Sequence, residues 1–96
     1  MFIIDITYQV PLEQIDRHMK EHMIFLNKHY DAGHFLLSGR KLPRTGGIII
    51  SKASSKQELE GWLAEDPFFN HQLATFTITE FNPSQFQAEL SSFINS

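Results

Sequence analysis

The spacing of apolar residues along the chain switches between a period of two and a period of three to four. Phe2–Val10 alternates, with Phe2, Ile4, Ile6, Tyr8 and Val10 on one face, which predicts a half-buried strand. From Leu12 to Tyr30 the apolar positions are Leu12, Ile15, Met19, Met23, Leu26 and Tyr30, the spacing of an amphipathic helix. Asp31-Ala32-Gly33 is expected to end this helix, because Gly33 can adopt the left-handed conformation of a C-terminal cap.

The same switch recurs along the rest of the chain. In order, the pattern predicts a strand at His34–Gly39, a connection at Arg40–Gly47, a strand at Ile48–Ala53, a helix at Lys56–Glu65 and a strand at Leu73–Phe81. Ser55 and Glu58 have the spacing of a capping box at the start of the second helix. Asp66-Pro67 is expected to close it.

This β-α-β-β-α-β order predicts an α+β, ferredoxin-like fold, with an antiparallel sheet and both helices on one face. A chain of 96 residues organises one core, so residues 1–96 are expected to form a single domain. Residues 1–82 would be the βαββαβ core and residues 83–96 a C-terminal helix opening at Pro83. Its apolar stripe would dock on the body or on a partner subunit. The stripe consists of Phe86, Leu90, Phe93 and Ile94.

The run Ile48-Ile49-Ile50 is apolar on both sides of its strand. Both faces of the sheet should therefore be covered, although the helices can cover only one. Face-to-face packing of two sheets, as in a dimeric α/β barrel, is the simplest solution and predicts a homodimer.

Composition excludes several classes of function. The chain has no Cys, which excludes disulfides, thiolate metal sites and Cys nucleophiles. Its 8 basic and 11 acidic residues give a net charge of −3, so nucleic acid is not an expected partner. The longest apolar run, Met23–Leu26, is too short to span a membrane. Because the N-terminus also lacks the features of a signal peptide, a cytoplasmic location is expected.

Three of the 5 histidines, His18, His22 and His29, lie on the first predicted helix. His18 and His29 are expected at the core boundary, with the ring buried and one nitrogen toward solvent. His22 lies between the core positions and the rim, where a partly desolvated imidazole can serve as a general base. His18 and His22 also have the i, i+4 spacing of metal ligands. Without a Cys or the acidic residue that completes such a helical motif, no metal and no cofactor are expected.

Asp66 has two interpretations. An Asp before Pro commonly forms a turn through its carboxylate, and a carboxylate can also orient a histidine and hold its tautomer. No spacing rule brings Asp66 to His22, but the topology places the two helices side by side.

A cationic loop follows the second strand. Arg40, Lys41 and Arg44 precede Gly46-Gly47, so this loop either holds an anionic ligand or is simply solvated. Ser38 has no adjacent base in the sequence, which favours a hydrogen-bonding role over a nucleophilic one.

Several segments in their order resemble the YCII-related (YciI-like) family of small dimeric proteins. They are Glu21-His22-Met23, Gly33–Gly39, Gly46–Ile50, Glu65-Asp66-Pro67-Phe68 and Thr79-Glu80-Phe81. The resemblance implies a ferredoxin-like dimer and a pocket built around a characteristic His and Asp, here His22 and Asp66. One branch of the family resembles dehydrochlorinases of chlorinated hydroxyquinols. The family often has Pro after the Ser-Gly pair, and Arg40 at that position favours a more anionic ligand.

The leading hypothesis is a cofactor-independent enzyme of proton-transfer, lyase- or isomerase-like chemistry acting on a small anionic or phenolic compound. His22 would be the base and Asp66 its partner, with Ser38, Gly39 and Arg40 binding the substrate. One alternative is a non-catalytic dimer that binds a small molecule or a protein through the same pocket. Another is a ferredoxin-like dimer that oxidises small aromatics without a cofactor, or that binds haem through a helical His.

Overall fold

The computed structural model describes residues 1–96 and contains one four-stranded antiparallel sheet. Its strands are β1 (Phe2–Tyr8), β2 (Phe35–Arg40), β3 (Gly46–Ser51) and β4 (Ala74–Glu80), in the spatial order β2-β3-β1-β4. The helices between them are α1 (Leu12–Arg17), α2 (Met19–Asp31), α3 (Lys56–Leu63) and α4 (Pro67–Asn70). This arrangement confirms the α+β, ferredoxin-like prediction.

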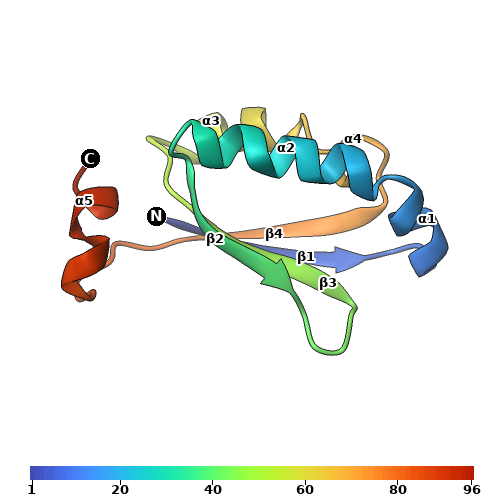
Figure 1. Ribbon diagram of the computed structural model, residues 1–96, viewed down its shortest axis with the longest axis horizontal. Coiled ribbons are helices and arrows are strands. Elements are labelled where there is room, and N and C mark those ends of the chain that lie inside the picture. The colour runs from blue at the N-terminus through green and yellow to red at the C-terminus, as the bar shows by residue number, and fades with distance from the viewer.

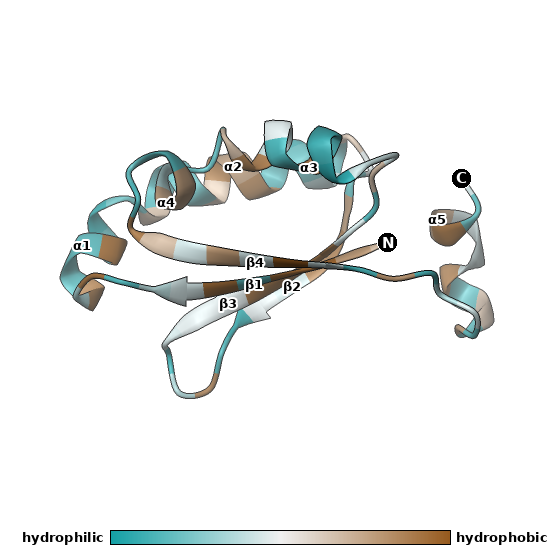
Figure 2. Ribbon diagram, turned by 180° about the vertical axis from the view of Figure 1, so that it is seen from behind, coloured by the Kyte–Doolittle hydropathy of each residue, from teal (hydrophilic) through white to brown (hydrophobic).

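All of these helices lie on one side of the sheet (Figure 1). The hydropathy colouring shows apolar residues concentrated on the central strands beneath the helices (Figure 2). The main core joins the two layers and consists of Phe2, Ile4, Ile6, Phe25, Leu26, Phe35, Ile49, Leu59 and Leu63. No helix of the chain is long and apolar enough to span a bilayer.

The first predicted helix is in fact two helices, which corrects the sequence-based expectation. The break is at His18, where φ is −106° and ψ is 5°. Beyond it, α2 buries Phe25, Leu26 and His29, whereas Met23 is 45% exposed. The buried face differs from the expected Met19–Met23–Leu26 stripe because the rings of Phe25 and His29 pack on Phe35 of β2, with centroids 5.7 and 5.1 Å away.

The predicted helix Lys56–Glu65 ends earlier than expected, and a short helix that the sequence pattern missed follows it. Ser55 caps α3 as predicted, accepting a hydrogen bond from the Glu58 backbone N–H at 3.1 Å. Asp66 then adopts an extended conformation, as residues before Pro do, and caps α4. Pro67 occupies the first turn of α4, where its missing N–H costs no hydrogen bond.

The C-terminal segment also differs from the prediction. No helix opens at Pro83; a single 3₁₀ turn, η1 (Ala88–Leu90), leads into α5 (Ser91–Ile94). The segment extends beyond the end of the sheet (Figure 1) and none of its residues is fully buried. It is held through Lys52, which donates to the Phe93 carbonyl at 3.3 Å and to the Ser96 hydroxyl. Short helices need tertiary packing to be stable. Because the apolar stripe of this segment is only partly covered, a helix from Pro83 would gain too little from packing to form.

Strand β3 begins at Gly46, two residues before the predicted start at Ile48, because Gly46 and Gly47 pair with Thr7 and Ile6 of β1. Gly46 is buried, and a Cβ at this position would lie 1.8 Å from the carbonyl oxygen of Ile6. Only a residue without a side chain permits this close approach of the two strands.

We expect Gly46→Ala to destabilise the fold by about 3 kcal/mol or more, because the new methyl group meets backbone that cannot move aside. Gly61→Ala in α3 is the matched control. That position has open space around it, so the helix should gain about 0.5–1 kcal/mol. Urea unfolding of both variants measures the difference, and equal stabilities would contradict the packing argument.

Candidate functional site

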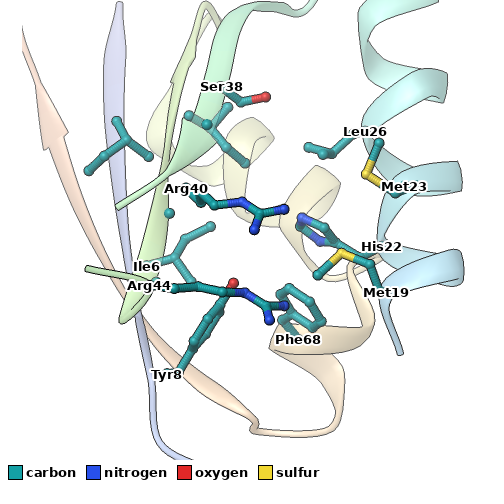
Figure 3. Close-up of a pocket in the computed structure, with 15 residues that line it drawn as sticks. Ile6, Tyr8, Met19, His22, Met23, Leu26, Ser38, Arg40, Arg44 and Phe68 are labelled. Atoms are coloured by element: carbon teal, nitrogen blue, oxygen red, sulfur yellow. The ribbon is translucent and has the colours of Figure 1, made fainter. Parts of the chain in front are cut away.

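A cavity of about 240 Å³ lies between α2 and the β2–β3 hairpin. One wall is apolar and is formed by Met19, Met23, Leu26 and Phe68. The other wall carries the polar side chains of Tyr8, Ser38, Arg40 and Arg44, with His22 between the two walls (Figure 3). The cavity can therefore hold a compact ligand with an apolar body and a negatively charged or hydroxylated edge.

His22 and Asp66 are in direct contact. The distance from Nδ1 of His22 to Oδ1 of Asp66 is 2.9 Å, and the Asp66 side chain is 0% exposed. The same oxygen accepts the backbone N–H of Phe68 at 3.1 Å. Asp66 therefore fulfils both interpretations that the sequence left open, since it caps α4 and also holds the imidazole of His22.

This contact determines which nitrogen of His22 is available. With Asp66 ionised and His22 neutral, the carboxylate can only accept a hydrogen bond, so Nδ1 carries the proton and Nε2 keeps its lone pair. The ring is stacked on Phe68, with centroids 4.1 Å apart and planes 11° apart. Nε2 is thus the nitrogen that can take a proton from a ligand in the cavity.

The second carboxylate oxygen of Asp66, Oδ2, is buried and has no hydrogen-bond partner. The hydrogen bonds that stabilise this buried carboxylate are therefore both made by Oδ1, one with His22 and one with the backbone of α4. Loss of His22 would leave Asp66 with the backbone contact alone, so the histidine matters for the carboxylate as much as the reverse.

The structure separates the three cations of the loop that the sequence could not distinguish. Lys41 lies outside the cavity, because its Nζ pairs with Asp5 at 2.5 Å. Arg44 lines the cavity and donates from Nη2 to Oδ1 of Asp16 at 2.5 Å, which raises the pKa of Arg44 and lowers that of Asp16. Arg40 also lines the cavity but makes no ion pair, and its guanidinium points toward His22 (Figure 3).

The other predicted ligand-binding residues, Ser38 and Gly39, also line the cavity. The Ser38 hydroxyl is 2.6 Å from the hydroxyl of Tyr30, in keeping with the hydrogen-bonding role that we predicted over a nucleophilic one. Sequence reasoning missed Tyr8 and Phe68 as cavity residues. The only available signals were that Tyr8 lies on the inner face of its strand and that Phe68 follows Asp66 closely.

A second histidine cluster lies further along α2. His29 is 1% exposed, and its Nε2 is 2.8 Å from Oε1 of Glu65, which also accepts from Lys28 at 2.9 Å. Its Nδ1 lies 2.9 Å from Nδ1 of His34. His29 is therefore fully buried with both nitrogens bonded inside the protein, which corrects the expected boundary position. Because Glu65 and His34 form hydrogen bonds with both ring nitrogens, the imidazole can be buried without hydrogen bonds to water.

The directions of the hydrogen bonds in this cluster are set by the carboxylate of Glu65, which can only accept. Glu65 accepts, so His29 donates from Nε2 and accepts at Nδ1 from the Nδ1–H of His34. The His34 ring is stacked on Trp62 at 3.7 Å. Burial, together with the neighbouring His29, lowers the pKa of His34 below its ordinary 6.5. The hydrogen bond from Lys28 lowers the pKa of Glu65.

We expect the protein to lose stability as the pH falls below about 6.5, because the unfolded chain then binds a proton at His34 more readily than the folded chain does. His34→Gln should flatten this dependence. Urea unfolding at pH values from about 7.5 to about 5.5, a range that brackets the ordinary pKa of His, measures the pH dependence of stability. The lowered pKa of Glu65 acts in the same direction but below 4.5, outside this window. Parallel profiles for wild type and variant would contradict the assignment.

Comparison with known proteins gives a family and a fold. The model of the YCII-related domain matches residues 1–82. Among solved structures, the chain is similar to 5-chloro-2-hydroxyhydroquinone dehydrochlorinase (TftG) from Burkholderia phenoliruptrix AC1100, in complex with 2,5-dihydroxybenzoquinone. That match has a TM-score of 0.71 and 17% identity, and covers 85% of this chain and 94% of the other. No curated protein sequence matches the chain.

Proposed function

The chain belongs to the YCII-related family, and on this basis we propose that it is an enzyme of proton-transfer, lyase- or isomerase-like chemistry. The substrate would be a small anionic or phenolic compound, and the reaction would need no cofactor. The observation that carries the proposal is the 2.9 Å contact between His22 and the fully buried Asp66 at the wall of the cavity.

In the proposed reaction, Nε2 of His22 removes a proton from a carbon or hydroxyl group of the substrate. The bond to hydrogen breaks, a new N–H bond forms, and the electron pair remains on the substrate as an enolate or phenolate. Asp66 stabilises the resulting imidazolium through Nδ1–H. In a lyase the electron pair then expels a leaving group and the imidazolium releases its proton to the leaving group or to water, whereas in an isomerase the substrate takes the proton back from the imidazolium at another position.

Arg40 would stabilise the negative charge that develops on the substrate. It faces His22 across the cavity and has no carboxylate partner of its own (Figure 3). Arg44 adds positive charge at the same wall, although Asp16 partly balances it. Guanidinium groups positioned in a desolvated cavity stabilise developing anions more strongly than water does.

The size and lining of the cavity favour a single-ring compound. About 240 Å³ is below the roughly 300–1,000 Å³ of pockets for drug-sized ligands. The solved neighbour holds 2,5-dihydroxybenzoquinone, a one-ring compound with ionisable hydroxyls. A ligand of that kind would place its ring against Phe68 and Met19 and its oxygens toward Arg40.

We expect His22→Gln, whose amide can still donate to Asp66, to lower turnover by about 10²–10⁴-fold, the usual contribution of general base catalysis, while the far-UV circular dichroism stays unchanged. The measurement is ¹H NMR in D₂O of a panel of small phenols and oxo acids, including 5-chloro-2-hydroxyhydroquinone, followed for deuterium incorporation or loss of substituents. A panel compound that wild type and His22→Gln convert equally fast would contradict the role of His22.

Two variants of the cationic loop separate binding from chemistry. Arg40→Gln should raise KM, and should lower kcat as well if Arg40 stabilises the transition state. Lys41→Gln removes an equal charge that points out of the cavity and should retain wild-type kinetics. If a compound binds saturably but no panel member is ever converted, the non-catalytic binding module replaces the enzyme hypothesis.

The tautomer of His22 can be tested without a substrate. Long-range ¹H–¹⁵N NMR correlations should show the Nδ1–H form in wild type, and Asp66→Asn should remove this preference because an amide can also donate. An Nε2–H form in wild type would leave no base facing the cavity.

We also propose that the chain forms a homodimer, and the open face of the sheet supports this arrangement. In the register with β1, Ile50 pairs with Ile3 on the face opposite the helices, and Leu37 of β2, paired with Ile50, is 54% exposed. No helix covers this side (Figure 2). A second copy presenting the same face would bury these side chains.

We expect light scattering after size exclusion to give twice the monomer mass of 11.1 kDa. Ile50→Asp should yield a folded monomer, because the introduced carboxylate would be buried against its symmetry mate. Thr77→Asp, on an exposed position of the same face at β4, tests how far the interface extends. Wild type eluting as a monomer at micromolar concentration would contradict the dimer.

A further inference from the structure

We propose that His18, Glu21 and His71 form a binding site for a divalent transition-metal ion, with Zn²⁺ as the reference ion. One ring nitrogen of each histidine and one carboxylate oxygen of Glu21 lie within 4.8 Å of one another. None of the three lines the cavity around His22. The proposal therefore does not depend on the proposed catalytic function.

The local backbone brings these side chains together. His18 is the residue at the break between α1 and α2, and Glu21 follows in the first turn of α2. His71 is the C-terminal cap of α4. The next residue, Gln72, has φ of 57°, a conformation that non-glycine residues seldom adopt. The chain turns sharply after His71, whose ring lies beside that of His18 with centroids 4.7 Å apart.

The three groups have no other partners to satisfy them. Nδ1 of His18 is buried and makes no hydrogen bond, which is uncommon for a buried polar atom. No ion pair involves Glu21 or His71, whereas the other surface clusters of this chain contain Lys or Arg. Two histidines and a carboxylate without a neighbouring cation are well suited to bind an added positive ion.

The tertiary structure also replaces the pairing that the sequence indicated. His18 and His22 have the i, i+4 spacing of metal ligands, but Nδ1 of His22 is bound to Asp66 and its ring is stacked on Phe68. The partner of His18 is instead His71. The acidic residue that the sequence motif lacked at the usual position is Glu21, three residues after His18.

The chemistry of the ligand set favours zinc or a similar ion. Two imidazoles and one carboxylate bind Zn²⁺ at about 2.0–2.2 Å and leave a fourth position for water. Tetrahedral ligands at these distances lie about 3.4 Å apart, so the donor atoms, which lie within 4.8 Å of one another, must move closer together to bind the ion. Glu21 and His71 are exposed and their side chains are free to make this movement.

A bound ion would connect α2 to α4. The same two segments carry His22 and Phe68, and Asp66 caps α4. His18 lies one turn before His22, and His71 follows Phe68 by three residues. The ion would act as a clamp on the elements that position the cavity, which gives it a stabilising role with no part in the proposed reaction.

The test is calorimetric titration of the tag-free, metal-stripped protein with Zn²⁺, with thermal unfolding followed in parallel. We expect saturation at one ion per chain and a higher Tm with zinc. His71→Ala and Glu21→Gln should each weaken binding by at least about tenfold, and since both side chains are exposed, both variants should fold. Binding should weaken at lower pH as protons compete for the histidines.

Two controls test the assignment. His22→Gln, which keeps a donor for Asp66, should bind zinc like wild type because the His22 imidazole is not a ligand, and so should His34→Gln in the other histidine cluster. Titration of the wild type with Co²⁺ should give the visible absorption of a four- or five-coordinate ion. Absence of saturable binding, full retention in His71→Ala, or loss in either control variant would overturn the proposal.

Discussion

The structure depends on a single buried carboxylate. Asp66 is fully buried, and a charge in that position is tolerated only when it is paired and hydrogen-bonded. Its Oδ1 accepts from the first turn of α4 and from His22 of α2. One atom therefore places α4 against α2, orients the imidazole and selects its tautomer. The stacking of His22 on Phe68 follows, because Phe68 belongs to the same turn that Asp66 caps.

The neighbouring residue extends this arrangement along α2. The side chains of Glu65 and Asp66 contact different histidines of α2, since Glu65 contacts His29 and Asp66 contacts His22. The two histidines are seven residues apart, a rise of about 10.5 Å in an α-helix. Two contacts, two turns apart on α2, therefore join this helix to the segment between α3 and α4. The cavity forms beside one attachment, and the packed His34–Trp62 stack beside the other.

Electrostatics at the hairpin completes the site. Gly46 allows a close approach of β3 to β1, and each cation of the hairpin has a different neighbour. Lys41 pairs with Asp5 and Arg44 with Asp16, which leaves Arg40 without a carboxylate beside His22. The guanidinium of Arg40 and the imidazole of His22 face the same space (Figure 3), which places a positive charge and a proton-accepting ring beside one cavity.

Sequence alone determined the order of strands and helices, the cap at Ser55, and the candidacy of His22, Asp66, Ser38, Gly39 and Arg40, because periodicity and turn chemistry report the local environment of each residue. Tertiary structure decided the break at His18, the helix α4, the separation of Arg44 from Lys41 and the partner of each histidine. Contacts such as His22–Asp66 span 44 residues. They depend on how α2 rotates over the sheet, and the packing of Phe25 and His29 on Phe35 sets that rotation.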